Sequence, residues 1–99
     1  MIYITLLLFV RDGKEQLLNE YESKVLPLLT SYGGRLLYRI RPQKGQHIVT
    51  PEHYPYEVHI VSFPSVTDFE QYKADDVRKS YSYLYTESVE KAILIQGVT

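Results

Sequence analysis

Residues Tyr56 to Ser65 read YEVHIVSFPS, and this segment decides the fold because it predicts a strand that leads directly into a helix. Alternate side chains of a strand point to opposite faces of a sheet. One face takes Tyr56, Val58, Ile60 and Ser62, and the other takes Glu57, His59, Val61 and Phe63. Both sets are mostly apolar or aromatic, so we expect a central strand that is covered on both faces. Pro64 ends the strand, and Ser65 with Asp68 has the spacing of a helix-capping pair.

Three further strands are predicted around this segment. Ile2–Val10 (IYITLLLFV) has almost no polar residue on either side, so the chain's own helices can cover only one of its faces and the other needs another cover. Arg35–Pro42 (RLLYRIRP) alternates an apolar face with a face that carries three arginines, as expected for a half-exposed edge strand. The apolar face consists of Leu36, Tyr38 and Ile40. Ala92–Val98 (AILIQGV) is the last strand.

A helix is predicted over Gly13–Tyr32, with Asp12 and Glu15 at the spacing of a capping box. Its apolar residues recur at helical spacing and form one stripe. The stripe consists of Leu17, Leu18, Tyr21, Val25, Leu28, Leu29 and Tyr32. Outside the stripe lie Glu15, Glu20, Glu22 and Lys24. The pattern therefore indicates a helix that packs one side on a sheet.

Two features predict how this helix bends and ends. Pro27 removes the hydrogen bond to Ser23, so we expect a kink over 23–26. Gly33 and Gly34 must leave a helix and enter a strand within two residues. We therefore expect a positive φ at this pair, and strain if Gly34 is replaced by a β-branched residue.

The second half of the chain predicts a short helix from Val66 to Tyr72 and another that begins at Asp75–Asp76. In the second of these helices, one face is formed by Val77, Tyr81, Leu84, Tyr85 and Ser88. The loop Pro42–Pro55 is long, and His47–Val49 is a candidate extension of the ladder. The order strand, helix, strand, strand, helix, strand predicts an α+β, ferredoxin-like split βαβ fold with a four-stranded antiparallel sheet. We expect one domain over residues 1–99.

Composition excludes several functional classes. The net charge is −1, and no block of Lys and Arg is present, which argues against a nucleic-acid or anionic-membrane surface. There are no cysteines, so disulfides, zinc–thiolate sites and thiol nucleophiles are excluded. The first strand is too short to span a bilayer and lacks the marks of a signal peptide, so a cytoplasmic location is expected. Ten tyrosines in 99 residues indicate an interface or a pocket wall, or simply strand propensity.

Two segments carry a family resemblance. LPLLTSYGGRLLYR (26–39) and VHIVSFPSVTDFEQY (58–72) resemble the small dimeric α+β barrel proteins, with greatest similarity to a branch of unknown function related to antibiotic-biosynthesis monooxygenases. Muconolactone-type isomerases and polyketide cyclases share that fold. The resemblance implies a homodimer whose two sheets pack face to face, with a pocket between sheet and helices in each protomer. A partner sheet would also cover the second apolar face of Ile2–Val10.

His59 is the candidate catalytic residue, because imidazole titrates near neutral pH and a strand holds it in the interior. It can serve as a general base or a hydrogen-bond anchor, and the alternative is a structural histidine satisfied by a neighbour such as Arg39 or Arg41. Arg39 is a candidate for binding a carboxylate ligand, although an arginine row is more often a solvated strand edge. His47, His53 and His59 with Glu52 and Glu57 fit no compact metal motif, so no metal is predicted.

Five tyrosines on strands and helices are expected to converge on one layer as substrate-binding residues, or to form a tyrosine-rich core. They are Tyr38, Tyr56, Tyr72, Tyr81 and Tyr85. Such a pocket suits a small aromatic ligand. The sequence therefore favours a small-molecule-binding protein without a cofactor, either an enzyme of the monooxygenase, isomerase or cyclase type or a non-catalytic sensing dimer. An interaction module with a filled pocket is the remaining alternative.

Overall fold

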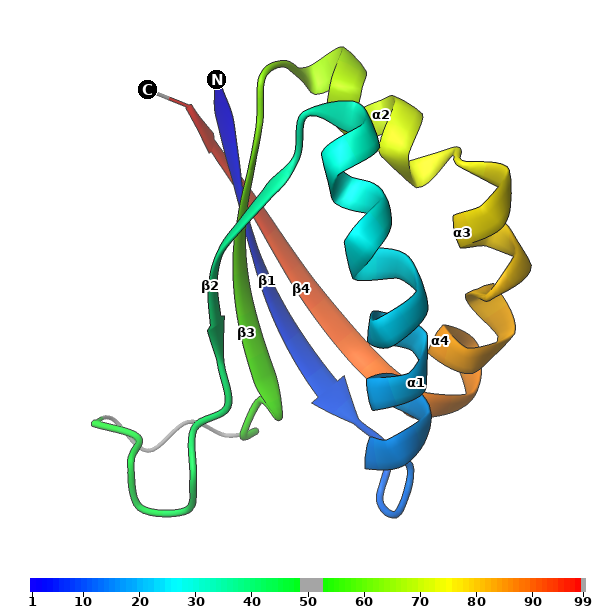
Figure 1. Cartoon of the computed structure of the whole chain (residues 1–99). Helices are drawn as coiled ribbons and strands as arrows, with labels where there is room; N and C mark the ends of the chain where they lie inside the picture. Colours follow the sequence, from blue (N-terminus) through cyan, green and yellow to red (C-terminus); the bar gives the residue numbers. More distant parts are fainter. Residues whose placement is uncertain (49–52, 99) are drawn as a thin grey trace.

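The structure, a computed structural model, describes residues 1–48 and 53–98. Its four strands form one antiparallel sheet in the order β2-β3-β1-β4. They are β1 (Ile2–Val10), β2 (Arg35–Ile40), β3 (Glu57–Phe63) and β4 (Val89–Val98). The helices all lie against one face of this sheet, as Figure 1 shows. The predicted α+β, ferredoxin-like fold is confirmed, with β1 and β3 at the centre.

The strand register determines which side chains meet on the helix-covered face. Leu6 of β1 lies opposite His59 of β3, and Leu8 lies opposite Glu57. On the other side of β3, Arg39 of β2 also lies opposite His59. The predicted alternation along β3 is thereby confirmed, and the glutamate and the histidine point towards the helices.

A register shift between Leu36 and Tyr38 changes the faces of β2. Leu36 pairs with Val61 on the helix-covered face, whereas Tyr38 pairs with Ile60 on the opposite face. The prediction that Leu36 and Tyr38 share one face is therefore wrong, because one extra residue in a strand reverses the alternation beyond it. The shift places Arg39 on the helix-covered face, where its side chain remains 40% exposed.

The first helix begins later than predicted. Helix α1 spans Glu15–Val25, and its N-cap residue is Lys14, which makes no side-chain capping bond. Gly13 has a φ of 79°, and the Lys14 N–H donates to the carbonyl of Arg11, so a turn occupies the place of the expected Asp12 cap. The 3-10 helix η1 (Leu26–Tyr32) then continues the path, with proline in its first turn. At the predicted kink, the α-helix therefore changes to the tighter 3-10 helix.

The two glycines after η1 have different roles. Gly33 has a φ of 71° and ends the helix in the left-handed conformation. Gly34 has no positive φ, so that part of the prediction is wrong. A Cβ atom on Gly34 would lie 2.8 Å from Cε1 of Phe63 and 3.0 Å from the carbonyl oxygen of Leu29. Close packing, rather than backbone conformation, requires glycine there.

Three short helices follow β3. In α2 (Val66–Lys73), Ser65 Oγ accepts a hydrogen bond from the Asp68 N–H at 3.2 Å, which confirms the predicted cap. Helix α3 spans Asp76–Ser80 and α4 spans Ser82–Ser88, so the predicted continuous helix is broken at Tyr81. Val77 is exposed and does not join the packed face. This segmented path curves over the same side of the sheet as α1 (Figure 1).

Apolar side chains fill the space between sheet and helices in two clusters, one around Phe63 and one around Leu18. The opposite sheet face remains open, and it presents Tyr38, Ile40, Ile93 and Ile95 as exposed apolar residues. In the loop, His47 and Ile48 lie outside any strand, and the rest of the expected ladder extension, Val49, lies outside the described residues. Among the described residues, no helix is both long and apolar enough to cross a bilayer.

Candidate functional site

Glu57 forms the centre of a buried polar cluster beneath the helices. Its side chain is fully buried and accepts from three donors. Arg39 Nε and His59 Nε2 each lie 2.5 Å from Oε1, and Arg41 Nε lies 3.0 Å from Oε2. The arginines come from β2 and the segment after it, and they reach inward because of the register shift. Both oxygens of Glu57 are therefore satisfied inside the protein.

Glu22 of α1 completes this cluster, but only half of its carboxylate is satisfied. Its Oε2 accepts from Arg39 Nη2 at 2.5 Å and lies 3.7 Å from His59 Nε2. Its Oε1 has no hydrogen-bond partner among the described residues. Bulk water cannot easily replace that partner, because Glu22 is only 2% exposed. An unpaired buried oxygen costs roughly 1–3 kcal/mol. Glu22 thus retains an acceptor that can bond to a ligand or an ordered water.

The cluster fixes the charge of His59. Burial alone lowers the pKa of this imidazole, but the carboxylates of Glu22 and Glu57 outweigh burial and raise it to about 9. Burial alone raises the pKa of Glu57, but its bonds with His59 and Arg39 lower it to about 2. At neutral pH the pair is therefore an imidazolium and a carboxylate. His59 is then a proton donor, and the general-base role expected from the sequence would require it to lose that proton first.

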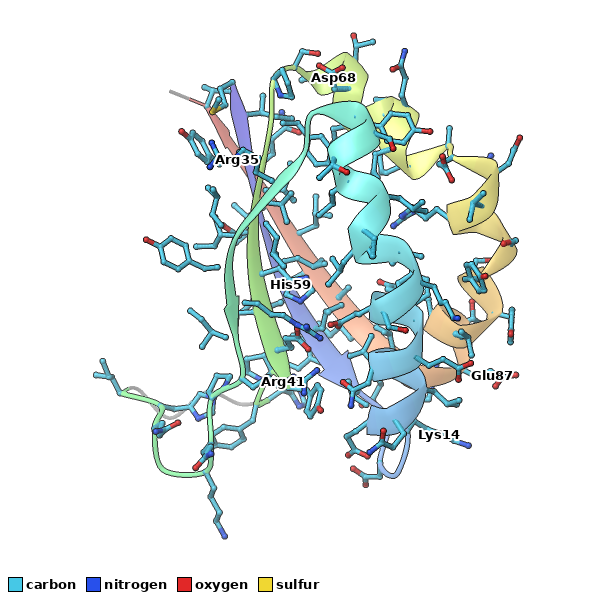
Figure 2. All side chains as sticks on the ribbon, in the orientation of Figure 1. Lys14, Arg35, Arg41, His59, Asp68 and Glu87 are labelled. Carbon is cyan, nitrogen blue, oxygen red and sulfur yellow. The ribbon has the colours of Figure 1, made fainter. Side chains whose placement is uncertain are left out.

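A cavity of about 110 Å³ opens beside this cluster, between the sheet and the helices. Glu22 and His59 provide polar lining. The apolar lining includes Leu6, Leu8, Leu18, Val25, Leu29, Phe63 and Leu94. Figure 2 shows His59 directed from β3 towards α1, into this layer and away from the open sheet face. An engineered cavity of about 150 Å³ lined by apolar side chains holds benzene, so this one, at about 110 Å³, has room for one ring at most.

Three tyrosines and one arginine line another part of the cavity wall. They are Tyr21, Tyr72, Tyr85 and Arg78. Burial raises the pKa of each of the three tyrosines, while the positive charge of Arg78 opposes the rise. The phenols therefore remain neutral at neutral pH. This wall is amphipathic, with aromatic faces and hydroxyl groups together.

Only some of the predicted site residues reach the cavity. His59, Tyr72 and Tyr85 line it. Tyr81 packs against the Leu18 cluster and is not part of the lining. Arg39 does not line the cavity, because it bonds to both carboxylates. Its side chain is also 40% exposed, so it still lies at a partly solvated edge of the sheet.

Two other predicted tyrosines lie elsewhere. Tyr56 packs at the edge of the Leu18 cluster, and its ring lies 5.1 Å from the guanidinium carbon of Arg41. Tyr38 is 61% exposed and lies on the open sheet face, because of the register shift in β2. The prediction that all five tyrosines converge on one layer is therefore wrong.

Sequence reasoning missed Glu22, Tyr21 and Arg78 as lining residues. Glu22 was placed outside the apolar stripe, yet at 100° per residue it lies only about 20° beyond Leu29. Its position four residues after Leu18 and three before Val25 is the signal that identifies it as buried. No comparable sequence pattern predicts that Arg78 lines the cavity. The orientation of α3 depends on the break between α3 and α4 at Tyr81.

The polar cluster also has ligand types suitable for a metal ion. Glu22, Glu57 and His59 each offer one ligand atom, and these atoms lie within 4.8 Å of one another. Arg39 already bonds to both carboxylates, so a cation would have to displace a guanidinium. Of the five residues considered from the sequence, His59 and Glu57 belong to this cluster, whereas His47 and His53 lie in the loop and Glu52 lies outside the described residues. We retain the absence of a metal as a prediction.

Solved structures share this fold. A protein of unknown function from Rhodopseudomonas palustris superimposes with a TM-score of 0.84 at 19% identity, over 97% of this chain and 79% of that chain. An uncharacterised NIPSNAP domain protein from Burkholderia xenovorans has a TM-score of 0.74 at 15% identity, over 100% and 94%. A dimeric protein of unknown function with a ferredoxin-like fold, from Bacteroides fragilis, has a TM-score of 0.71 at 12% identity, over 99% and 95%.

These likenesses establish a fold shared with dimeric ferredoxin-like proteins, and no specific activity. No known protein family matches the sequence, and neither does any curated protein sequence. The expected relation to antibiotic-biosynthesis monooxygenases is not among these likenesses and stays a prediction. Function must therefore be argued from the cavity and its polar groups.

Proposed function

We propose that this protein binds a small, largely apolar organic molecule with one hydrogen-bond donor in the cavity beside Glu22 and His59. The observation that carries the proposal is the unpaired Oε1 of Glu22, buried at the wall of an apolar cavity of about 110 Å³. An apolar pocket with a few convergent polar groups is the usual form of a ligand site. The volume limits the ligand to one ring at most, such as a phenol or a cyclic ketone.

Calorimetric titration of the protein with phenol and toluene tests this proposal. The phenol hydroxyl can donate to Glu22, whereas toluene can only fill the cavity. Glu22→Gln replaces a charged acceptor with a neutral one, so phenol affinity should fall about tenfold while toluene affinity stays unchanged. Glu20→Gln, on the exposed side of α1, is the matched control and should bind both compounds as the wild type does. Absence of phenol binding to the wild type would contradict the proposal.

The same geometry supports an enzyme that transfers protons without a cofactor. The Glu22 carboxylate can take a proton from the carbon beside a carbonyl group while the His59 imidazolium protonates the carbonyl oxygen, which gives an enol. Reversal of the two transfers regenerates both groups. Isomerisation and aldol-type cyclisation begin with this step, so these reaction types are favoured over oxygenation.

Hydrogen–deuterium exchange separates the enzyme from a non-catalytic binding protein. Cyclohexanone carries exchangeable hydrogens beside its carbonyl group and is one ring in size. In deuterated buffer, an enzyme should exchange these hydrogens faster than buffer alone, and Glu22→Gln should abolish the gain. Binding without exchange would leave the ligand-binding or sensing alternative. A filled interaction module is disfavoured, because side chains leave the cavity open.

We also propose that the protein is a homodimer joined through the open sheet faces. Tyr38, Ile40, Ile93 and Ile95 are exposed on that face in a single chain. The similarity to a dimeric protein of this fold supports the proposal. Burial of such a face contributes roughly 25 cal/mol per Å² of apolar area before the costs of association.

A further inference from the structure

Arg78 is a cation that the polar cluster does not use. Its backbone N–H donates to Asp75 at the start of α3, and its Nη1 donates to the carbonyl oxygen of Lys73 at 3.4 Å. Its guanidinium carbon lies 4.9 Å from the ring centre of Tyr72. Its Nε is buried and has no partner within the described part of the chain. Nor does its side chain form a salt bridge with any carboxylate of residues 1–48 and 53–98.

Among the described residues that line the cavity, Glu22 is the one carboxylate, whereas His59, Lys73 and Arg78 carry positive charge. The carboxylates of Glu22 and Glu57 face three cations, which are Arg39, Arg41 and the protonated His59. Arg78 lines the cavity in addition to these groups. Water partly screens Arg39 and Arg41, whose side chains are 40% exposed, but it screens the buried His59 at the cavity wall much less. A bound anion would therefore be attracted to this cavity.

Lys73 is the other cation in the lining, but it is a weaker candidate for holding an anion. Its Nζ lies 3.0 Å from Glu70 Oε1, and its side chain is 42% exposed. Arg78 has a free buried N–H and the planar fork that binds a carboxylate with two parallel bonds. The anion is thus expected at Arg78.

We propose that the cavity selects a monocyclic aromatic acid with a ring hydroxyl, whose carboxylate binds Arg78 and whose hydroxyl donates to Glu22 Oε1. This inference rests on the proposed function, because it uses the same cavity. It assigns Arg78 as the residue that determines specificity for acids over neutral phenols. The apolar wall holds the ring, and the two unpaired polar groups select its substituents.

Calorimetric titrations with 4-hydroxybenzoate and phenol test this assignment on the whole chain. The wild type should bind 4-hydroxybenzoate at least about tenfold more tightly than phenol. Arg78→Gln should remove that advantage, because it keeps the backbone cap and removes the charge, so the affinity for 4-hydroxybenzoate should fall about tenfold more than the affinity for phenol. Arg78→Lys should restore part of the advantage. Arg35→Gln, at an exposed position on β2, is the matched control and should change neither affinity.

The possible failures are distinguishable. If phenol binds and 4-hydroxybenzoate binds no more tightly, the selection of acids is wrong while the proposed function stands. If Arg78→Gln weakens both compounds equally, Arg78 has only a structural role and the inference fails. If the variant keeps the advantage for the acid, the carboxylate is bound elsewhere and the assignment to Arg78 is overturned. If neither compound binds to the wild type, the proposed function fails and this inference fails with it.

Discussion

The Nε2 atom of His59 lies 2.5 Å from Oε1 of Glu57, two residues away on the same face of β3. Alternate residues of a strand share a face, so the side chains of Glu57 and His59 lie next to each other on β3. Arg39 and Arg41 balance the glutamate, and the glutamate keeps the histidine charged. The ion pair therefore couples the stability of the protein to the protonation of His59, which lines the cavity.

Replacement of His59 by phenylalanine should lower the free energy of unfolding by about 2 kcal/mol, because Glu57 loses a buried donor. Denaturant unfolding measures this change. His53→Phe, in the exposed loop, is the matched control and should have little effect. If His59→Phe also melts lower but binds phenol as the wild type does, His59 is a structural residue and not part of the ligand site. An unchanged stability would contradict the importance of the ion pair.

Stability should depend on pH through the same pair. The pKa of His59 is raised from 6.5 to about 9, so its contribution is fully present below pH 6.5 and is lost as the pH rises through about 9. The pKa of Glu57 is lowered from 4.5 to about 2, so its contribution is present above pH 4.5 and is lost as the pH falls through about 2. Glu22, Arg39 and Arg41 are the other charged groups that face the pair.

Thermal unfolding across this pH range measures both losses. The alkaline loss between pH 6.5 and about 9 should be much smaller in His59→Gln, which cannot titrate there. A wild-type curve with no decline in that window would show that His59 has an ordinary pKa.

Gly34→Ala should destabilise the fold by roughly 2 kcal/mol, because the added methyl group would overlap Phe63 and approach the backbone of Leu29. Neither a buried ring nor a main-chain oxygen can move aside cheaply. Gly97→Ala is the matched control, since a Cβ atom there meets nothing within 4 Å. Equal melting temperatures for the two variants would show that η1 and Phe63 can separate without cost.

Ile95→Glu should convert the protein from a dimer to a monomer. Ile95 is 55% exposed on the open sheet face, where a partner sheet would bury the new charge. Sedimentation of the wild type should give about twice the 11.6 kDa of one chain, and the variant should give one chain. Val66→Glu, exposed on α2, is the matched control and should remain dimeric. A monomeric wild type at micromolar concentration would contradict the proposed interface.

The fold was predictable from the sequence because its signals are local and consistent. The alternation along β3, the Ser65 cap and the left-handed Gly33 after η1 depend on neighbouring residues, and the structure confirms these three. The candidate site was less predictable. His59 was identified because imidazole titrates near neutral pH and the central strand holds it in the interior.

Arg39 was expected near His59, but the side chains that complete the site, Glu22 and Arg78, were not predicted, because tertiary packing places them. The register shift in β2 places Tyr38 on the open face and Arg39 on the helix-covered face, and no pattern in the sequence predicts that shift. Glu22 lies at the edge of the apolar stripe of the first helix, where a small rotation of the helix decides whether a side chain is buried or exposed. Arg78 depends on a break between two short helices.

A crystal structure of the protein grown with phenol tests the central claim most directly. We expect the ring in the cavity between β1, β3 and α1, with its hydroxyl oxygen about 2.7 Å from Oε1 of Glu22. The cavity and the free oxygen define that position. A structure in which ordered water alone satisfies Glu22, with phenol absent from the cavity or bound only at the surface, would contradict the account.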